Sequence, residues 1–444
     1  MTSQMSPPGG SQLDSVGQRP QAAREPTELH EEMAQPVAYV EKRIVMSCHC
    51  NRINGTFRFL PSRAFSKSGM VEIDINHHYD SRKFSGQLAV SYFPSCQPEV
   101  LILTKTVCFR LGEGKHDPTL YFCPVCGCHL FKEEWETIDG EVFGPTWTVA
   151  TGVVEQMPKT FTISRHINVN QTGDGGLSIW MRARNDNTII PTDIIEQNSM
   201  SLPAKGYAPW SPTPYANPPG PGYTKGDTLE ASCFCGTVKF HVTRPTQAST
   251  LPKSQYPDLM IPYHTKSDKI PNPEDKKWWI RGPHPDNAGP GKDRYLAGTC
   301  ACTSCRRCSG FDIQSWAFIP RANIFMRHSK KQSMGLDFSN LPAGMLRSYS
   351  SSPGVTREFC PGCGATVFWH NTDRPELIDV SVGLFNDPKG VRAEDWLDWW
   401  AERVSFAEDR CEASGLLWDP VTCLATGLKG YIEARAGVGR SMKN

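Results

Sequence analysis

The sequence predicts a mainly β fold made of two tandem zinc-binding domains, and three observations lead to this prediction. Short runs that alternate apolar and polar residues, as strands do, fill much of the chain. Examples are VLILTKTVCF, FTISRHINV, SWAFIP and LIDVSVGLF. Cysteines stand in closely spaced groups of the kind that bind metal. Three motifs also recur in the same order in two blocks of the chain, which indicates a duplicated domain.

The two blocks can be compared motif by motif. The first opens with MSCHCNRINGTFRF and the second with ASCFCGTVKF, so both read C-x-C followed by a strand. Later the first block has YFCPVCGCHLF and the second has EFCPGCGATVFW, which both read F-C-P-x-C-G. Between these motifs lie INHHYDSRKFSG in the first block and GTCACTSCRRCSG in the second. The second of these stretches looks like a site, and the first looks like the remnant of one.

The repeat and the local composition divide the chain into parts. We expect a disordered segment at residues 1–40, which are rich in Pro, Gly, Ser and Gln. A degenerate first domain at residues 41–190 is joined by a Pro/Gly-rich linker, 191–226, to a second domain at 227–412. The second domain carries an insertion at 245–297, and a C-terminal extension follows at 413–444.

Charge and apolar content restrict the function. The 444 residues carry a net charge of +1, which argues against general binding to nucleic acid or membrane. The partner that we expect, from the cysteine motifs analysed below, is a small-molecule substrate. No apolar run reaches about 18 residues and the N-terminus has no apolar signal segment, so we expect a cytoplasmic protein. Its 17 cysteines then stay reduced, and clustered reduced cysteines bind metal or react more often than they pair. Helical periodicity is weak, and only residues 392–406 are predicted as an amphipathic helix.

The outer cysteine motifs predict two structural zinc sites. A C-x-C knuckle and a distant C-x-x-C knuckle together supply four thiolates for a tetrahedral zinc, and a site closed by four thiolates has no position for substrate. The alternative is chance proximity of free cysteines, and Cys128 is a spare thiol without an assigned role. The expected ligands are Cys48, Cys50, Cys123 and Cys126 in the first block, and Cys233, Cys235, Cys360 and Cys363 in the second.

The middle motif of the second block predicts a catalytic metal site. Cys300, Cys302 and Cys305 can place three thiolates around one zinc and leave its fourth position open, as catalytic zinc requires. Arg306 and Arg307 follow directly, and we expect them to lower the thiol pKa values and attract an anionic substrate. Two alternatives remain at this point: Cys308 closes the site as a fourth ligand, or the four cysteines form a redox switch.

An overlay of the middle motifs indicates that the first block has lost this metal. The residues from Arg306 to Gly310 align with those from Arg82 to Gly86, so the position of Cys308 accepts a phenylalanine. The same overlay puts Asn76, His78 and Ser81 in place of the three cysteines, and this set cannot hold zinc with an open position. A replacement site made by His77 and His78 is a weaker alternative, because adjacent side chains on a strand face opposite ways.

These motifs resemble the glutathione-dependent formaldehyde-activating enzyme family, which includes centromere protein V. The second block matches all three motifs of that family and the first block matches the outer two. The resemblance implies a twisted β-tent (Mss4-like) fold, a structural and a catalytic zinc, and a lyase-type activity on thiol adducts, with glutathione as a candidate co-substrate. Three zinc ions per chain are then expected, because the first block keeps only its outer site.

The chain departs from the family in its tandem arrangement, its extension past Cys411 and its long insertion. The insertion precedes the middle motif, and loops beside sites set specificity, so Trp278, Trp279 or Arg281 is expected to touch substrate. An ordinary surface excursion is the alternative. No general base is evident, and His264, His328 and His370 are candidates by residue type alone.

The sequence therefore predicts a zinc-dependent lyase-type enzyme that acts on a C–S or C–O bond of a small molecule, or isomerises it. The expected catalytic residues are Cys300, Cys302, Cys305, Arg306 and Arg307. Two rival functions are a non-catalytic zinc scaffold for a protein partner and a thiol or metal redox sensor.

Overall fold

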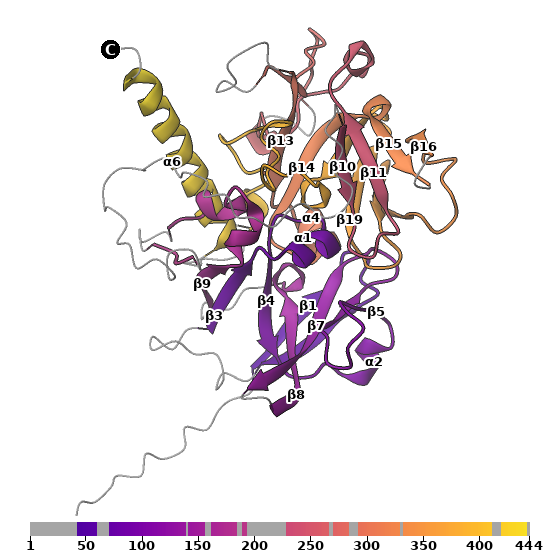
Figure 1. Cartoon of the computed structure of the whole chain (residues 1–444), viewed down its shortest axis with the longest axis vertical. Helices are drawn as coiled ribbons and strands as arrows, with labels where there is room; N and C mark the ends of the chain where they lie inside the picture. Colours follow the sequence, from indigo (N-terminus) through magenta and orange to yellow (C-terminus); the bar gives the residue numbers. More distant parts are fainter. Residues whose placement is uncertain are drawn as a thin grey trace, which may run out of the picture. The chain divides into compact units, whose positions relative to one another are not determined.

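Strands dominate the chain, which confirms the predicted mainly β fold (Figure 1). The computed structural model describes residues 42–59, 71–138, 141–155, 161–183, 189–192, 228–265, 270–283, 292–328, 332–410 and 419–441. The expected disordered segment 1–40, nearly all of the expected linker and Cys411 lie outside these residues.

The first block consists of nine strands, two short helices and three 3-10 turns within its described part. Its strands are β1 Lys42–Ser47, β2 Asn54–Phe59, β3 Val71–Asn76, β4 Val90–Ser95, β5 Val107–Arg110, β6 Thr119–Phe122, β7 His129–Ile138, β8 Glu141–Ala150 and β9 Phe161–Ile167. Its helices are α1 Tyr79–Ser85 and α2 Val100–Leu103, and its 3-10 turns are η2 Thr151–Val153, η3 Val169–Thr172 and η4 Gly176–Ile179.

The second block contributes the remaining strands and ends in a long helix. Its strands are β10 Thr228–Ser232, β11 Lys239–Thr243, β12 Ile280–Arg281, β13 Arg294–Cys300, β14 Gln314–Pro320, β15 Ile324–Arg327, β16 Ser333–Gly335, β17 Arg347–Ser352, β18 Val355–Phe359, β19 Thr366–Asn371, β20 Leu377–Ser381 and β21 Leu397–Trp399. The helices are α4 Thr303–Ser309 and α6 Pro420–Ser441, and the 3-10 turns are η5 Gln247–Thr250, η6 Tyr263–Thr265, η7 Arg321–Asn323 and η8 Val382–Leu384.

The large sheets of the two blocks have the same strand order. The first runs β5-β6-β7-β8-β4-β3-β9, and the second runs β17-β18-β19-β20-β14-β13, with β12 and β21 both pairing with β13. In each sheet the last position is held by a parallel partner, β9 beside β3 and β21 beside β13. Helix α1 follows β3 and helix α4 follows β13, so the middle motif occupies the same topological place twice.

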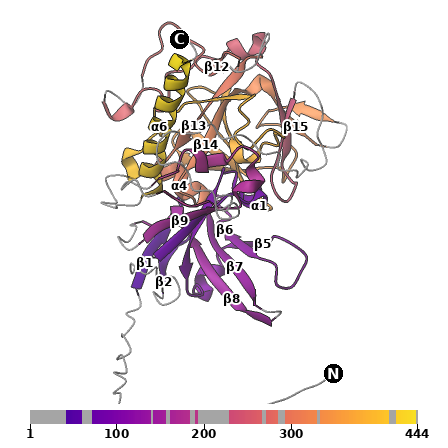
Figure 2. The same cartoon turned by 60° about the vertical axis from the view of Figure 1, so that its left-hand side comes forward.

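The blocks contact each other through reciprocal hydrogen bonds around these two helices. The backbone N–H of His49, inside the first C-x-C, donates to the carbonyl of Arg307, 3.0 Å away, and that of Phe234 donates to the carbonyl of Lys83, 3.1 Å away. Gly152 N–H donates to the Gly310 carbonyl as Gly383 N–H donates to the Gly86 carbonyl. Such pairs are the signature of a self-complementary, two-fold type of interface. Figures 1 and 2 show α1 and α4 where the two groups of strands meet.

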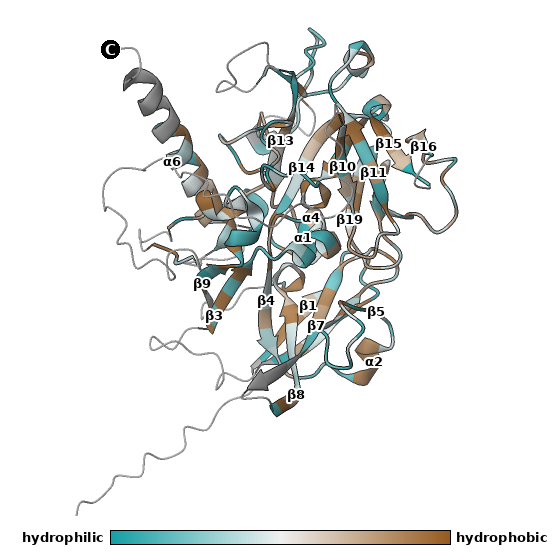
Figure 3. Cartoon of the chain, viewed as in Figure 1, coloured by the Kyte–Doolittle hydropathy of each residue, from teal (hydrophilic) through white to brown (hydrophobic). Residues whose placement is uncertain are grey.

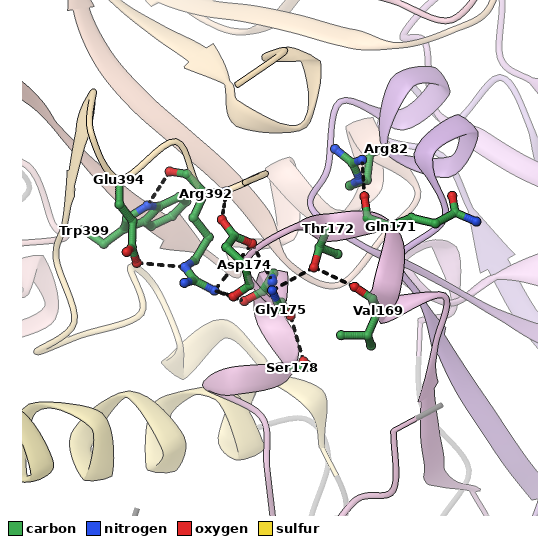
Figure 4. Close-up of polar contacts among 11 residues, drawn as sticks. Arg82, Val169, Gln171, Thr172, Asp174, Gly175, Ser178, Arg392, Glu394 and Trp399 are labelled. Carbon is green, nitrogen blue, oxygen red and sulfur yellow. Dashed lines mark hydrogen bonds and ion pairs between the residues drawn. The ribbon is translucent and has the colours of Figure 1, made fainter. Parts of the chain in front are cut away.

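A buried ion pair and a shared core also join the blocks. Arg392 donates through Nη1 to the carbonyls of Asp174, at 2.6 Å, and Gly176, at 2.9 Å, while its N–H donates to the Asp174 carboxylate (Figure 4). One hydrophobic cluster runs from Leu88 and Trp180 of the first block to Phe368 of the second. Residues Tyr39–Asn444 accordingly form one compact unit. The predicted domain boundaries within it stay a prediction.

Two local predictions are wrong. Residues 392–406 do not form a helix: Leu397–Trp399 is strand β21, held parallel to β13, and Ala393 before it has a positive φ of 49°. The run VLILTKTVCF, predicted as one strand, begins as helix α2 and becomes a strand only at β5. Figure 3 shows α2 as a hydrophobic segment, and its Val100 and Leu101 are exposed. For residues 392–406, pairing with β13 outweighs the local pattern.

The C-terminal extension folds as α6 and packs on the first block. Val421, Leu424 and Leu428 are buried, and the coloured part of α6 in Figure 3 includes hydrophobic residues. The Trp180 ring meets the Tyr431 ring edge-on. No helix in the described residues is long and apolar enough to cross a membrane.

Candidate metal centres and the cavity beside them

The structure brings the outer cysteines together into two four-sulfur clusters. In the first block the Sγ atoms of Cys48 and Cys50 lie 3.5 Å apart, and that of Cys50 lies 3.5 Å from Cys123. In the second block Cys235 and Cys360 are separated by 3.4 Å. Within each cluster, completed by Cys126 and by Cys233 with Cys363, all four sulfurs lie within 4.8 Å of one another.

Turns with positive φ shape both knuckles. Gly127 and Gly364 have φ of 76° and 75°, and their N–H groups donate to the carbonyls of Cys123 and Cys360. Glycine adopts this left-handed conformation at little cost, so the turn can fold tightly around the sulfurs. The first knuckles match as well, because Asn51 takes the left-handed position that Gly236 holds in the second block.

Zinc fits these two clusters. A tetrahedral zinc with bonds of about 2.3 Å to sulfur keeps its sulfurs roughly 3.8 Å apart, close to the observed spacing. Backbone N–H groups also point at the sulfurs, with Val125 N–H 3.4 Å from Cys123 and Val238 N–H 3.3 Å from Cys233. Such bonds favour thiolates over thiols. Four thiolates packed this closely need a cation among them, and a sulfur-only donor set selects zinc or a similarly soft metal.

The middle cysteines form a third cluster with three sulfurs. Cys300 ends β13, Cys302 is the N-cap of α4, and Cys305 lies in its first turn. The Cys305 N–H donates to the Cys302 sulfur over 3.2 Å, and the helix N-terminus favours the thiolate there. The three sulfurs lie within 4.8 Å of one another, so the donor set fits one zinc with a position to spare.

Cys308 does not belong to this cluster. It is buried, its sulfur is not part of the three-sulfur group and it does not line the cavity, and burial raises the pKa of its thiol to about 12. The closed four-cysteine site considered from the sequence is therefore not what the fold builds.

An arginine from a distant strand supports the cluster. Arg357 of β18 is buried, and both its Nη atoms donate to the Cys305 sulfur over 3.5 Å. The neighbouring Cys300 and Cys302 thiols, and after them Arg357, lower the pKa of Cys305 well below its ordinary value. Arg357 thus does what the sequence assigned to the two arginines beside the motif.

Arg306 and Arg307 themselves face the first block. Arg306 donates through Nη1 to the carbonyls of Gly152, at 2.6 Å, and Val154, at 2.8 Å, and Arg307 bonds the Ser47 carbonyl and Glu155. Neither lines the cavity next to the sulfurs. The predicted role in attracting substrate does not agree with these contacts. Successive side chains on a helix point about 100° apart, so residues that follow Cys305 directly face another way, and here that face meets the first block.

In the first block the three equivalent residues do other work. His78 caps α1 by accepting the Asp80 N–H at Nδ1, and the Asn76 side chain accepts the His78 N–H. His77 is buried against His166, with 2.9 Å between Nε2 and Nδ1, and so does not join His78. Among the described residues no metal-binding group includes these positions.

A cavity of about 380 Å³ opens beside the three-sulfur cluster. Trp316, Trp369 and Phe406 pack against the sulfurs, so one side of the cluster is apolar. The aromatic lining is completed by Tyr263, Trp278 and Phe318. Ligand cavities are typically of this size and are lined by aromatic residues with a few polar groups.

The insertion forms one wall of this cavity, through residues between Ser254 and Trp278. The wall is anchored by Asp258, whose carboxylate accepts bonds from Arg403, Ser405 and the Phe406 N–H. Of the residues expected to touch substrate, only Trp278 lines the cavity. Trp279 is buried with its Nε1 bonded to the Ser249 carbonyl, and Arg281 pairs with Asp398.

The three histidines considered as general bases lie elsewhere. His264 and His328 are exposed, and His370 stacks on Phe338 and bonds Glu358; none lines the cavity. The cavity instead holds three aspartates: Asp258, Asp373 and Asp379. Asp379 lies in the strand run LIDVSVGLF. The sequence analysis did not select it, although a single carboxylate among apolar strand residues is a signal of a functional position.

A comparison with known protein families finds a match in the second block. Residues 291–402 match the model of a family described as "Glutathione-dependent formaldehyde-activating enzyme". The match includes the middle cluster, Cys360 and Cys363, and lies entirely in the second block. No curated protein and no solved structure matches the chain. The second block is therefore similar to this enzyme-associated family, and its cysteine clusters suit the zinc that the family uses.

Proposed function

We propose that the protein is a zinc-dependent lyase-type enzyme whose active site is the three-sulfur cluster Cys300/Cys302/Cys305. The substrate is a small molecule in which a C–S or C–O bond is made, broken or shifted, with a glutathione adduct as a candidate. The observation that carries this proposal is that the cluster with three sulfurs lines an aromatic cavity.

Zinc held there would offer one open position to a substrate sulfur or oxygen. The chain's own residues then do the rest. Arg357 offsets negative charge at Cys305, which keeps the ligand set stable in a buried place. Trp316, Trp369 and Phe406 exclude water from one side and so strengthen polar contacts with the substrate.

The four-sulfur clusters are proposed as structural zinc sites, which gives three zinc ions per chain. The matching strand orders and reciprocal contacts support a tandem duplication in which the first block lost its middle metal. The first block then serves to support the second, because Arg306 and Arg307 bind it and the two share a core.

Elemental analysis and a turnover assay test the proposal. The zinc-loaded full chain should accelerate the exchange between formaldehyde, a thiol and their adduct, followed by NMR with glutathione and separately with benzyl mercaptan. Cys302→Ser should lose one zinc per chain and the acceleration. Cys308→Ser is the matched control, since its sulfur lies on the same helix but outside the cluster.

If the chain binds zinc as expected but does not accelerate the exchange with either thiol, the enzyme proposal is refuted and a non-catalytic zinc scaffold is favoured. Loss of metal with disulfide formation on mild oxidation would favour the sensor.

A further inference from the structure

An enzyme that binds a thiol or hydroxyl through its sulfur or oxygen needs a group to take the proton that leaves. This inference rests on the function proposed above. Three carboxylates line the cavity, so the question is which of them is free to act.

Asp258 is not free. Its Oδ1 accepts bonds from the Ser405 hydroxyl at 2.9 Å and the Phe406 N–H at 2.8 Å, and its Oδ2 accepts the Tyr263 N–H at 2.8 Å. Arg403 Nη2 bonds both oxygens. Both oxygens of Asp258 are therefore occupied by donors from the protein itself. Asp258 fixes the insertion wall, whereas Asp373 is exposed to solvent.

Asp379 differs from both. It lies in the middle of β20 with 7% of its surface exposed, opposite Phe318 on β14 and Trp369 on β19, which both line the cavity. Its Oδ1 accepts a bond from Arg374 Nη2 at 2.7 Å. Its Oδ2 has no hydrogen-bond partner among the described residues, although the side chain lines the cavity.

The surroundings hold this carboxylate in place and leave it basic. Burial raises the pKa of Asp379 to about 6, and the charge of Arg374 opposes that rise. Arg374 is itself held over the Trp369 ring, 4.7 Å from its centroid. The other charged or titratable groups that face Asp379 are Cys305 from α4, Arg357 from β18 and Tyr263 from the insertion. Near neutral pH the side chain is therefore mostly a carboxylate, yet close to taking up a proton.

We propose that Asp379 is the catalytic proton acceptor and donor of this cavity, with Arg374 as its positioning residue. As a thiol or alcohol ligand binds, its S–H or O–H bond breaks and an O–H bond forms at Asp379 Oδ2. The negative charge moves from the carboxylate to the ligand's sulfur or oxygen, and the proton returns when the product leaves. The thiol or alcohol group thus enters in its protonated, uncharged form, and the aromatic walls suit an apolar part of the same molecule.

Calorimetry measures this proton directly. Benzyl mercaptan, which keeps its proton at pH 7, is titrated into the zinc-loaded full chain in two buffers of different ionisation heat. The wild type should release almost no proton to the buffer at pH 7, and Asp379→Asn should release about one. Below pH 6, Asp379 is already protonated before the ligand binds. Proton release by the wild type should therefore approach that of Asp379→Asn.

Matched variants separate this role from a structural one. Asp387 has a pKa that burial raises to about 6 as well, but it lies outside the cavity, so Asp387→Asn should behave like the wild type. Asp379→Glu, which keeps the acid, should again release little. Equal proton release by the wild type and Asp379→Asn overturns the proposal while leaving the proposed function standing. Failure of the zinc-loaded wild type to bind benzyl mercaptan also overturns the proposal, whereas the proposed function falls only if the exchange with glutathione is not accelerated either.

Discussion

Helices α1 and α4 occupy equivalent places in the two blocks, but only one begins with a metal-binding set. Both are seven residues long, and both end at a glycine with positive φ, Gly86 and Gly310. At both N-caps a side chain accepts a backbone N–H, through Nδ1 in His78 and through sulfur in Cys302. The cap is therefore common to both helices, and the three cysteines add a metal-binding set to one of them.

The spaces beside the two helices differ in the same way. The cavity at α1, about 350 Å³, is lined by polar and charged groups such as Asp117, Lys132 and Glu134. The cavity at α4 has tryptophans in place of these and lies beside sulfur. The three-sulfur group and the aromatic walls thus occur together beside α4, and both are missing from the described residues beside α1.

The largest expected difference is between an outer and the middle cluster. Cys360→Ser opens a buried four-sulfur site whose metal binding contributes folding free energy, on the order of 10 kcal/mol in small zinc domains, so we expect insoluble protein. Cys302→Ser should leave a folded chain, because the first block folds with His78 at that place. Soluble yield, zinc content and melting temperature measure this; equal, low melting temperatures for both variants would show that the two roles are not distinct.

The reciprocal interface predicts equal losses at equivalent glycines. A Cβ at Gly86 would lie 2.3 Å from the Thr366 carbonyl oxygen, and one at Gly310 would lie 2.3 Å from the His129 carbonyl oxygen. Each alanine variant should lose about 3 kcal/mol of unfolding free energy, from left-handed strain and from displaced backbone.

Gly344→Ala is the control for these two, because Gly344 has a φ of 79° but no atom near its Cβ position. It should lose only the strain, about 1 kcal/mol. Denaturant unfolding measures all three variants, and equal losses would mean that the contact between blocks contributes nothing.

A smaller effect is expected where the first block touches α4. His49 bonds the Tyr349 hydroxyl through Nδ1, at 2.8 Å, and Ser304 Oγ through Nε2, at 3.1 Å. Because Ser304 lies between Cys302 and Cys305, His49→Ala should weaken zinc binding at the middle cluster about fivefold, the loss of roughly one hydrogen bond. Competition with a chelator measures this.

The equivalent residue of the second block gives the comparison. Phe234 packs on Phe109 and meets α1, which carries no cysteines, so Phe234→Ala should lower stability without changing zinc affinity at the middle cluster. An equal loss of zinc affinity in the His49→Ala and Phe234→Ala variants would indicate a general loosening of the fold.

The smallest effect is expected from restoring cysteines in the first block. Asn76→Cys, His78→Cys and Ser81→Cys together should add at most one zinc per chain and leave turnover unchanged, because the charged cavity there lacks the walls of the second. A second active site, seen as doubled turnover per chain, would contradict this.

The cysteine sets and the mainly β class could be predicted from the order of residues alone. C-x-C, C-x-x-C and C-x-C-x-x-C fix the local geometry of their sulfurs within one turn, so spacing alone predicts which residues gather. The repeated order of motifs likewise predicted two blocks with similar strands.

The surroundings of those sulfurs depend on long-range strand pairing and could not be predicted in this way. Arg357 and Asp379 reach the cavity because β14, β20, β19 and β18 pair side by side, which no local pattern encodes. The contacts of Arg306 were not predicted from the sequence, because the direction of its side chain depends on where the first block packs against α4. Residues 392–406 carry a helical pattern, yet their central Leu397–Trp399 segment pairs with β13. The backbone groups that it bonds belong to a strand far away in the sequence, and a local pattern of residue types does not encode such long-range pairing.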